Sequence, residues 1–129
     1  KGVLKPERVR EQVYSQLDIA PTVLDVMGLH EEKNHFLGRS LFASYDKERS
    51  VYLIQPYSGT YLGILKYPHK YIKHLTTGKE YFFNLSSDPG ERYNILDSTN
   101  NNDLSLLRKD LNRIYLNQKI LEMNRLWRE

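Results

Sequence analysis

The middle of this chain carries a run of short segments in which the hydrophobic period is two residues. Four such segments are rich in β-branched and aromatic residues and span 51–55, 60–67, 70–75 and 79–85. The residues between them have turn chemistry and span 56–59, 68–69 and 76–78. Because connections this short leave no room for crossover helices, we predict a four-stranded antiparallel meander.

A helical pattern follows the strands from about residue 103. Its apolar residues recur at three- and four-residue steps and form one stripe: Leu104, Leu107, Leu111, Ile114 and Leu121. Such a stripe needs an apolar partner, and the predicted sheet offers one. We therefore expect a carboxy-terminal helix that packs on one face of the meander.

A second, shorter helical pattern lies earlier in the chain, at about residues 17–27. Ser15 or Asp18 can cap it, because a short oxygen-bearing side chain accepts the free amides of a first helical turn. Pro21 fits that first turn, where its missing N–H costs nothing. Gly28 ends the pattern, since glycine takes the left-handed conformation cheaply. An irregular polar loop is expected up to about residue 49.

The composition excludes several classes of protein. Hydrophobic residues make up 40% of the chain, enough for a core, so disorder is not expected over most of its length. Nineteen basic against 16 acidic residues give a formal net charge of +3, without the dense positive stripe of a nucleic-acid surface. The chain has no cysteine, hence no disulfide, and no run of eighteen apolar residues that could span a membrane.

Three segments, taken in order, resemble one protein family. Residues 15–28 are similar to a segment of sulfatases and of lipoteichoic-acid-synthase-like phosphoglycerol transferases. Residues 38–41, Gly-Arg-Ser-Leu, resemble the short motif that follows it in that family. Residues 70–72 and 78–95 look like the family's closing strand and loop. The ordered set is more specific than any one segment.

The resemblance implies a fold and a division of the chain. The parent would have an α/β alkaline-phosphatase-like fold, of which this chain is an α+β fragment. Residues 1–49 would be the end of the main sulfatase domain, with its short helix and loop. Residues 50–129 would be a small carboxy-terminal subdomain. An opening without a methionine, Lys1-Gly2-Val3-Leu4, also favours a fragment of a longer protein.

The motif residues themselves have a structural interpretation. Those of the short helix, expected to start, shape and end it, are Asp18, Pro21, Thr22 and Gly28. Those of the later loop, expected to turn the chain from the last strand towards the final helix, are Asp88, Pro89 and Gly90. Pro89 would fix one backbone dihedral and Gly90 would free the next. We predict that neither set takes part in chemistry.

The implied chemistry belongs to the parent. Such enzymes hydrolyse or transfer a sulfate or phosphate ester through a divalent metal, here Ca, Mg, Mn or Zn, and a covalent intermediate. A parent of this kind would be periplasmic, extracellular or membrane-anchored and facing outward. Its partners would be the rest of the catalytic domain and the ester substrate, with no nucleic acid.

The chain lacks the family's nucleophile signature and its Asp-His metal pair. Its histidines show no ligand spacing with carboxylates and are interpreted as surface or loop residues: His30, His35, His69 and His74. We therefore expect no catalytic residue, no metal ligand and no cofactor within these 129 residues, and no activity from them alone.

Two further possibilities remain open. The first predicted hairpin carries Tyr57, Ser58 and Tyr61, which could form part of a substrate rim in the parent. Alternatively, the chain could be a free-standing binding module for anionic polymers. The basic residues that favour this alternative lie in the last helical pattern: Arg108, Lys109, Arg113, Lys119, Arg125 and Arg128. Steep salt dependence of polyanion binding would favour the module.

Overall fold

The computed structural model describes residues 12–29, 36, 38–57, 59–98 and 102–126, and the chain divides into two compact units, 1–51 and 52–129. The first unit holds a 3-10 turn, Gln16–Asp18, that leads into α1, Ile19–Val26. The strands are β1 (Val51–Gln55), β2 (Tyr61–Lys66), β3 (His69–His74) and β4 (Glu80–Asn84). A 3-10 turn, Leu96–Ser98, precedes α2, Asn102–Leu126.

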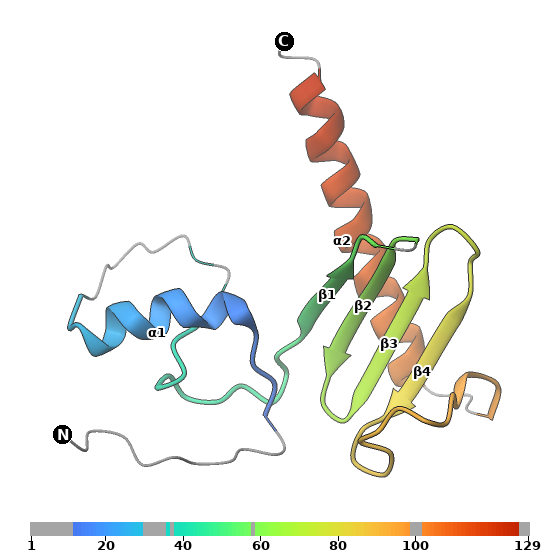
Figure 1. Ribbon diagram of the computed structural model, residues 1–129, viewed down its shortest axis with the longest axis horizontal. Helices are drawn as coiled ribbons and strands as arrows, with labels where there is room; N and C mark the ends of the chain where they lie inside the picture. The colour runs from blue at the N-terminus through green and yellow to red at the C-terminus, as the bar shows by residue number, and fades with distance from the viewer. Residues whose placement is uncertain (1–11, 30–35, 37, 58, 99–101, 127–129) are drawn as a thin grey trace. The chain divides into compact units, whose positions relative to one another are not determined.

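The four strands form one sheet in the order β1-β2-β3-β4, as Figure 1 shows. β2 and β3 pair antiparallel with Tyr61 opposite His74 and Lys66 opposite His69. β3 and β4 pair in the same sense, with Tyr71 opposite Phe82. The predicted four-stranded antiparallel sheet, with a short helix before it and a helix after it, is confirmed.

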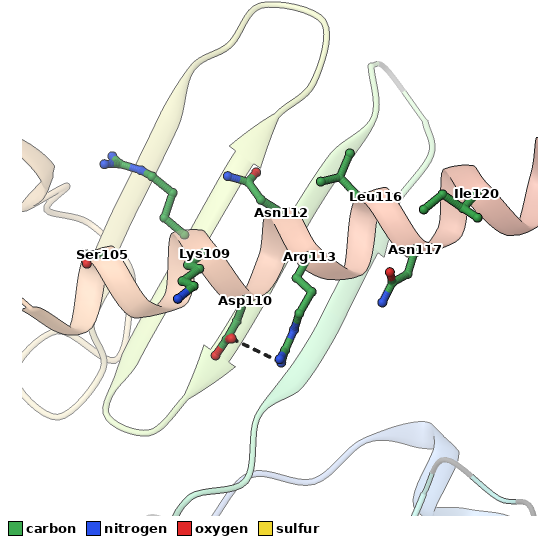
Figure 2. A pocket seen from close by; sticks show the side chains of 9 residues that line it. Ser105, Lys109, Asp110, Asn112, Arg113, Leu116, Asn117 and Ile120 are labelled. Carbon is green, nitrogen blue, oxygen red and sulfur yellow. Dashed lines mark ion pairs between the residues drawn. The ribbon is translucent and has the colours of Figure 1, made fainter.

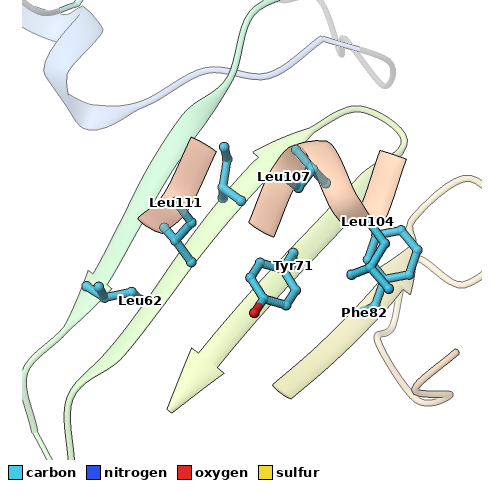
Figure 3. Packing of buried hydrophobic residues seen from close by; sticks show 7 residues of the cluster. Leu62, Tyr71, Phe82, Leu104, Leu107 and Leu111 are labelled. Carbon is cyan, nitrogen blue, oxygen red and sulfur yellow. The ribbon is translucent and has the colours of Figure 1, made fainter. Parts of the chain in front are cut away.

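The core of the second unit lies between the sheet and the first half of α2 (Figure 3). Its members are buried apolar side chains from both layers: Leu62, Ile64, Tyr71, Phe82, Leu104, Leu107 and Leu111. They come from alternate positions of the strands and from one face of the helix, as periods of two and 3.6 residues require. Each such side chain contributes about 1.5–3 kcal/mol of transfer free energy on burial.

α2 reaches beyond the part that the sheet covers (Figure 1). Leu104, Leu107 and Leu111 of the predicted stripe are buried, and Ile114 is half-buried. Residues 116–120 are all exposed, and the side chain of Leu121 lies outside the described part of the chain. Among the described residues, no helix is both long and apolar enough to cross a bilayer.

Outside β4, two further residues continue its hydrogen bonding. The backbone N–H of Phe82 donates to the side-chain oxygen of Asn94 at 2.9 Å. The N–H of Ile95 donates to the carbonyl of Phe82 at 2.9 Å, and the Asn94 amide donates to the carbonyl of Glu80 at 3.3 Å. The strand therefore has partners on its outer side although no fifth strand is present in the described sheet.

α1 ends as the sequence predicts a helix of this kind to end. Gly28 has φ +71°, the left-handed conformation. Its N–H donates to the carbonyl of Asp25 at 3.0 Å, and the N–H of Leu29 donates to that of Leu24 at 2.9 Å. This pair of bonds is the Schellman arrangement, which satisfies carbonyls that the last turn leaves free.

Candidate functional site

In the first unit, the motif segments at residues 15–28 and 38–41 meet at the carboxylate of Asp18. Its side chain is 1% exposed. One oxygen accepts the N–H of Ser15 at 2.7 Å, which completes a capping box with Ser15. The other accepts the N–H of Arg39 at 2.9 Å and the guanidinium of Arg49 at 2.5 Å. Asp18 therefore joins the start of the helix to two later segments of the loop.

These contacts determine the protonation of Asp18. Burial alone would raise the pKa of its carboxyl, because the charged form loses its hydration. The hydrogen bonds from Arg49, Ser15 and Arg39 outweigh that effect and hold the pKa below its usual value of 3.8. Asp18 is thus a charged carboxylate whose two oxygens both accept hydrogen bonds from this chain's own groups.

Thr22 and Ser40 add to the contacts that join the first helix to the loop after it, which we call the Asp18 joint. The Thr22 hydroxyl donates to the carbonyl of Asp18 at 2.5 Å and accepts the N–H of Leu41 at 3.0 Å. The Ser40 hydroxyl donates to the carboxylate of Asp25 at 2.5 Å. The Gly-Arg-Ser-Leu motif is therefore bound to α1 through both its backbone and its side chains.

Gly38 shows why that motif begins with glycine. A Cβ atom at this residue would lie 2.0 Å from the carbonyl oxygen of Leu17 and 2.8 Å from the backbone nitrogen of Asp18. These are main-chain atoms, which cannot rotate away. Pro21 lies buried in the first turn of α1. The geometry of the first unit is that of a structural joint.

The loop after β4 is organised by Asp88. Its carboxylate accepts the backbone N–H groups of Arg92 at 2.8 Å and Tyr93 at 2.9 Å. The residue of this loop with the left-handed conformation is Glu91, with φ +53°, and not the neighbouring Gly90. The Lys70 ammonium holds Glu91 there, at 2.7 and 2.8 Å from its two carboxylate oxygens. This ion pair offsets the cost of a non-glycine residue in that conformation.

The three rim candidates are not equivalent. Tyr57 lies between β1 and β2 and is 77% exposed. Tyr61 begins β2, and its ring meets that of His74 edge-on, with centroids 4.3 Å apart and an interplanar angle of 87°. Ser58 lies outside the described residues. Of the two described tyrosines, Tyr57 alone presents its ring to solvent.

The interpretation of His74 as a surface or loop histidine is wrong, because its ring is buried, with 7% of the residue exposed. His69 is half-buried, lies 3.1 Å from the carboxylate of Asp103 and stacks on Phe82. His30 and His35 lie outside the described residues. Within the described ranges, no group of three histidine, aspartate or glutamate side chains could hold a metal ion.

Sequence reasoning missed a half-buried group of polar side chains between the sheet and α2, around the buried Tyr71. Glu80 pairs with Arg108 of α2, and Lys73 lies 3.7 Å from the same carboxylate. Burial raises the pKa of the Tyr71 phenol to about 12. Its hydroxyl has no partner with hydrogen-bond geometry, although Arg108 and Glu80 lie near enough to influence that pKa. The spacing gave a signal: Glu80 is two residues from Phe82, and Arg108 is four from Leu104.

The outer side of α2 carries an open groove of about 790 Å³ (Figure 2). Figure 2 shows Lys109 and Arg113 projecting from the helix with the sheet behind it. Arg113 pairs with Asp110 at 3.3 Å, and the Lys119 ammonium lies 5.9 Å from the ring centre of Tyr115. Together with the pairing of Arg108, these contacts leave less free positive charge on α2 than the sequence alone indicates.

Comparison with known proteins identifies the fold. No protein-family model and no curated protein matches this chain. Among solved structures, it is similar to BT4656, which was solved with its substrate D-glucosamine-2-N,6-O-disulfate. The TM-score is 0.57 and the sequence identity is 21%, and the match covers 75% of this chain and 23% of BT4656. It is also similar to a proposed sulfatase from Bacteroides thetaiotaomicron VPI-5482. Here the TM-score is 0.54 and the sequence identity is 20%, and the match covers 86% of this chain and 25% of that sulfatase.

These likenesses show the fold of the chain as that of part of a sulfatase. The chain spans about a quarter of the length of the two sulfatase structures. The family resemblance read from the motif segments therefore agrees with the architecture of the described residues.

Proposed function

We propose that this chain is the carboxy-terminal part of a sulfatase-like hydrolase, where it completes the fold and contributes one side of the substrate rim. The observation that carries the proposal is the likeness to two sulfatase structures over 75% and 86% of this chain, against about a quarter of theirs. The order of the three motif segments supports it independently.

In this proposal the catalytic groups belong to the part of the enzyme upstream of this chain. Metal activation of an ester needs several hard ligands that converge on one point, and the described residues do not fit such a site. The motif residues around Asp18 instead use their polar groups on one another. The role of this chain is to complete and shape the enzyme.

The substrate rim is proposed to lie at the connection between β1 and β2. Tyr57 supports this because its ring is exposed there and can stack on the face of a sugar. A sulfated sugar is the substrate of BT4656. We extend that substrate class to the present enzyme as part of the proposal, and phosphate-ester transfer is the alternative chemistry.

The complete gene product tests the proposal. It is expected to release inorganic sulfate from sulfated glucosamine when a divalent metal is added, while the 129-residue chain alone does not. Transfer of phosphoglycerol without sulfate release would replace sulfatase by transferase chemistry. A folded gene product that cleaves neither ester, or a gene with no catalytic region upstream, would falsify the proposal.

A pair of variants tests the rim. Tyr57→Ala should raise KM for the sulfated sugar about tenfold with little change in kcat, as expected for lost uniform binding. Tyr93→Ala is the matched control, because Tyr93 is exposed to a similar degree but lies in the loop after β4. Equal effects of the two variants would remove Tyr57 from the rim.

A further inference from the structure

We propose that His74 is a positioning residue whose ring limits where Gly59 can lie and holds Tyr61 at the start of β2, and that it thereby influences the direction in which Tyr57 meets the substrate. The inference rests on the proposed function for its substrate, but its structural part stands on the contacts of the ring. Those contacts lie on three sides.

The first contact fixes the ring from the turn between β3 and β4. The backbone N–H of Thr77 donates to Nδ1 of His74 at 3.0 Å. A nitrogen that accepts a hydrogen bond carries no proton, so the neutral ring bears its proton on Nε2. The backbone N–H of His74 also donates to the carbonyl of Lys79 at 2.8 Å. The imidazole therefore has one orientation relative to the sheet.

The second contact is with Tyr61, the cross-strand partner of His74 in the β2–β3 register. The two rings meet edge-on at 4.3 Å, an arrangement that adds about 0.5–1.5 kcal/mol beyond area burial. Tyr61 is the first residue of β2, so this contact holds the end of the connection in place.

The third contact is with the connection itself. A Cβ atom at Gly59 would lie 2.4 Å from Nε2 and 2.6 Å from Cε1 of His74. The ring thus occupies the space beside Gly59, whose φ of +92° is also one that glycine adopts most easily. The next residue, Thr60, is held in place as well, because its carbonyl accepts the N–H of Leu75 at 2.8 Å. Tyr57 stands two residues before Gly59.

Together the contacts make the imidazole a spacer between two turns. One side is held by Thr77, the opposite side limits where Gly59 can lie, and Tyr61 covers an edge. A side chain that keeps the hold on Thr77 but leaves the space beside Gly59 empty should loosen the connection and spare the sheet. Asparagine is such a side chain, since its amide oxygen can replace Nδ1 as acceptor.

The experiment compares His74→Asn with His69→Asn in the complete gene product. His69 lies at the other end of β3 and does not face the connection, so it is a matched control. Hydrogen exchange of a peptide covering residues 55–62 should quicken about tenfold in His74→Asn, while β3 keeps its protection. With a sulfated glucosamine, KM should rise about tenfold at nearly constant kcat, a split that lost stability alone does not produce.

A further variant tests the contact with Gly59. Gly59→Ala should perturb the wild-type protein more than the His74→Asn protein, because the smaller side chain leaves room for the methyl group, while the strain of alanine at φ +92° is common to both. Unchanged exchange at residues 55–62 in His74→Asn, or additive effects of the two substitutions, would overturn the proposal. Faster exchange without a change in KM in an active enzyme would also overturn it. A wild-type protein without ester hydrolysis contradicts the proposed function, and exchange alone then decides the role of His74.

Discussion

Leu106 and Leu107 are neighbours in α2, yet Leu106 is 56% exposed and Leu107 is 3% exposed. The difference follows from the helical period, which points adjacent residues about 100° apart. Leu107 belongs to the core cluster that also contains Tyr71 and Phe82, and Leu106 lies outside it.

This pair gives a direct test of the packing of α2 on the sheet. Leu107→Ala should lower the free energy of unfolding by about 2–5 kcal/mol, the cost of emptying a buried leucine site. Leu106→Ala removes the same atoms from an exposed position and should change it by less than about 0.5 kcal/mol. Urea unfolding measures both. Equal losses would mean that the helix packs through another face.

The joint around Asp18 predicts a dependence on pH. A carboxyl whose pKa is lower in the folded than in the unfolded chain adds stability above its unfolded value of about 3.9. That contribution is lost as the pH falls through the lower folded value. Urea midpoints measured from pH 6 down to pH 2 should therefore fall less steeply in Asp18→Asn than in the wild type.

At neutral pH, Asp18→Asn should itself destabilise the first unit by about 3–5 kcal/mol, because Arg49 loses the partner of its buried charge. The sequence alone indicated a smaller loss, since it presented Asp18 as a capping residue only. Replacing Arg49 by methionine in the Asp18→Asn background should restore part of the lost stability. A double variant as unstable as the sum of both single variants would contradict the pairing.

Gly38 and Gly28 require glycine for two different reasons, lack of space at Gly38 and a left-handed backbone at Gly28. Gly38→Ala places a methyl group against the main chain of Leu17, and should cost more than about 3 kcal/mol, above the usual range for overpacking. Gly28→Ala meets no atom within 4 Å and should cost about 1–2 kcal/mol, the price of a left-handed alanine. Urea unfolding of the two variants checks the order, which the reverse result would contradict.

Tyr71 predicts a loss of stability in alkali. Its pKa is about 12 in the folded chain against 10.0 for an ordinary tyrosine. A raised pKa adds stability below the unfolded value, and this contribution is lost as the pH rises through the folded value. Between pH 10 and 12, Tyr71→Phe should therefore lose less stability than the wild type. Tyr57→Phe, at an exposed position, should follow the wild-type curve in the same urea titration.

The sheet and its helix could be predicted from the sequence because both depend on local periodicity. The strand ends differ from the predicted bounds by at most one residue, and Leu104, Leu107 and Leu111 lie in the core as expected. Periodicity says nothing of a residue such as Arg49, which stands in an irregular loop, 31 positions from Asp18.

The candidate site was less predictable for the same reason. His74 ends a strand, a position open to solvent in many sheets, and its burial depends on the β1–β2 connection that passes beside it. The left-handed conformation of Glu91 was not expected either, because Gly90 stands before it, and Glu91 is also the residue that pairs with Lys70 of β3. Tertiary contacts of this kind leave no mark in the spacing of residues.

The hydrogen bonds that Asn94 and Ile95 make with β4 affect how readily other protein chains can add to the sheet. An open strand edge is a template on which another chain can add, and the two edges of this sheet are β1 and β4. On β4 the carbonyl of Glu80 and both backbone groups of Phe82 are already hydrogen-bonded to the chain's own residues. The side chain of Asn94 and the backbone N–H of Ile95 thus help to protect that edge from aggregation.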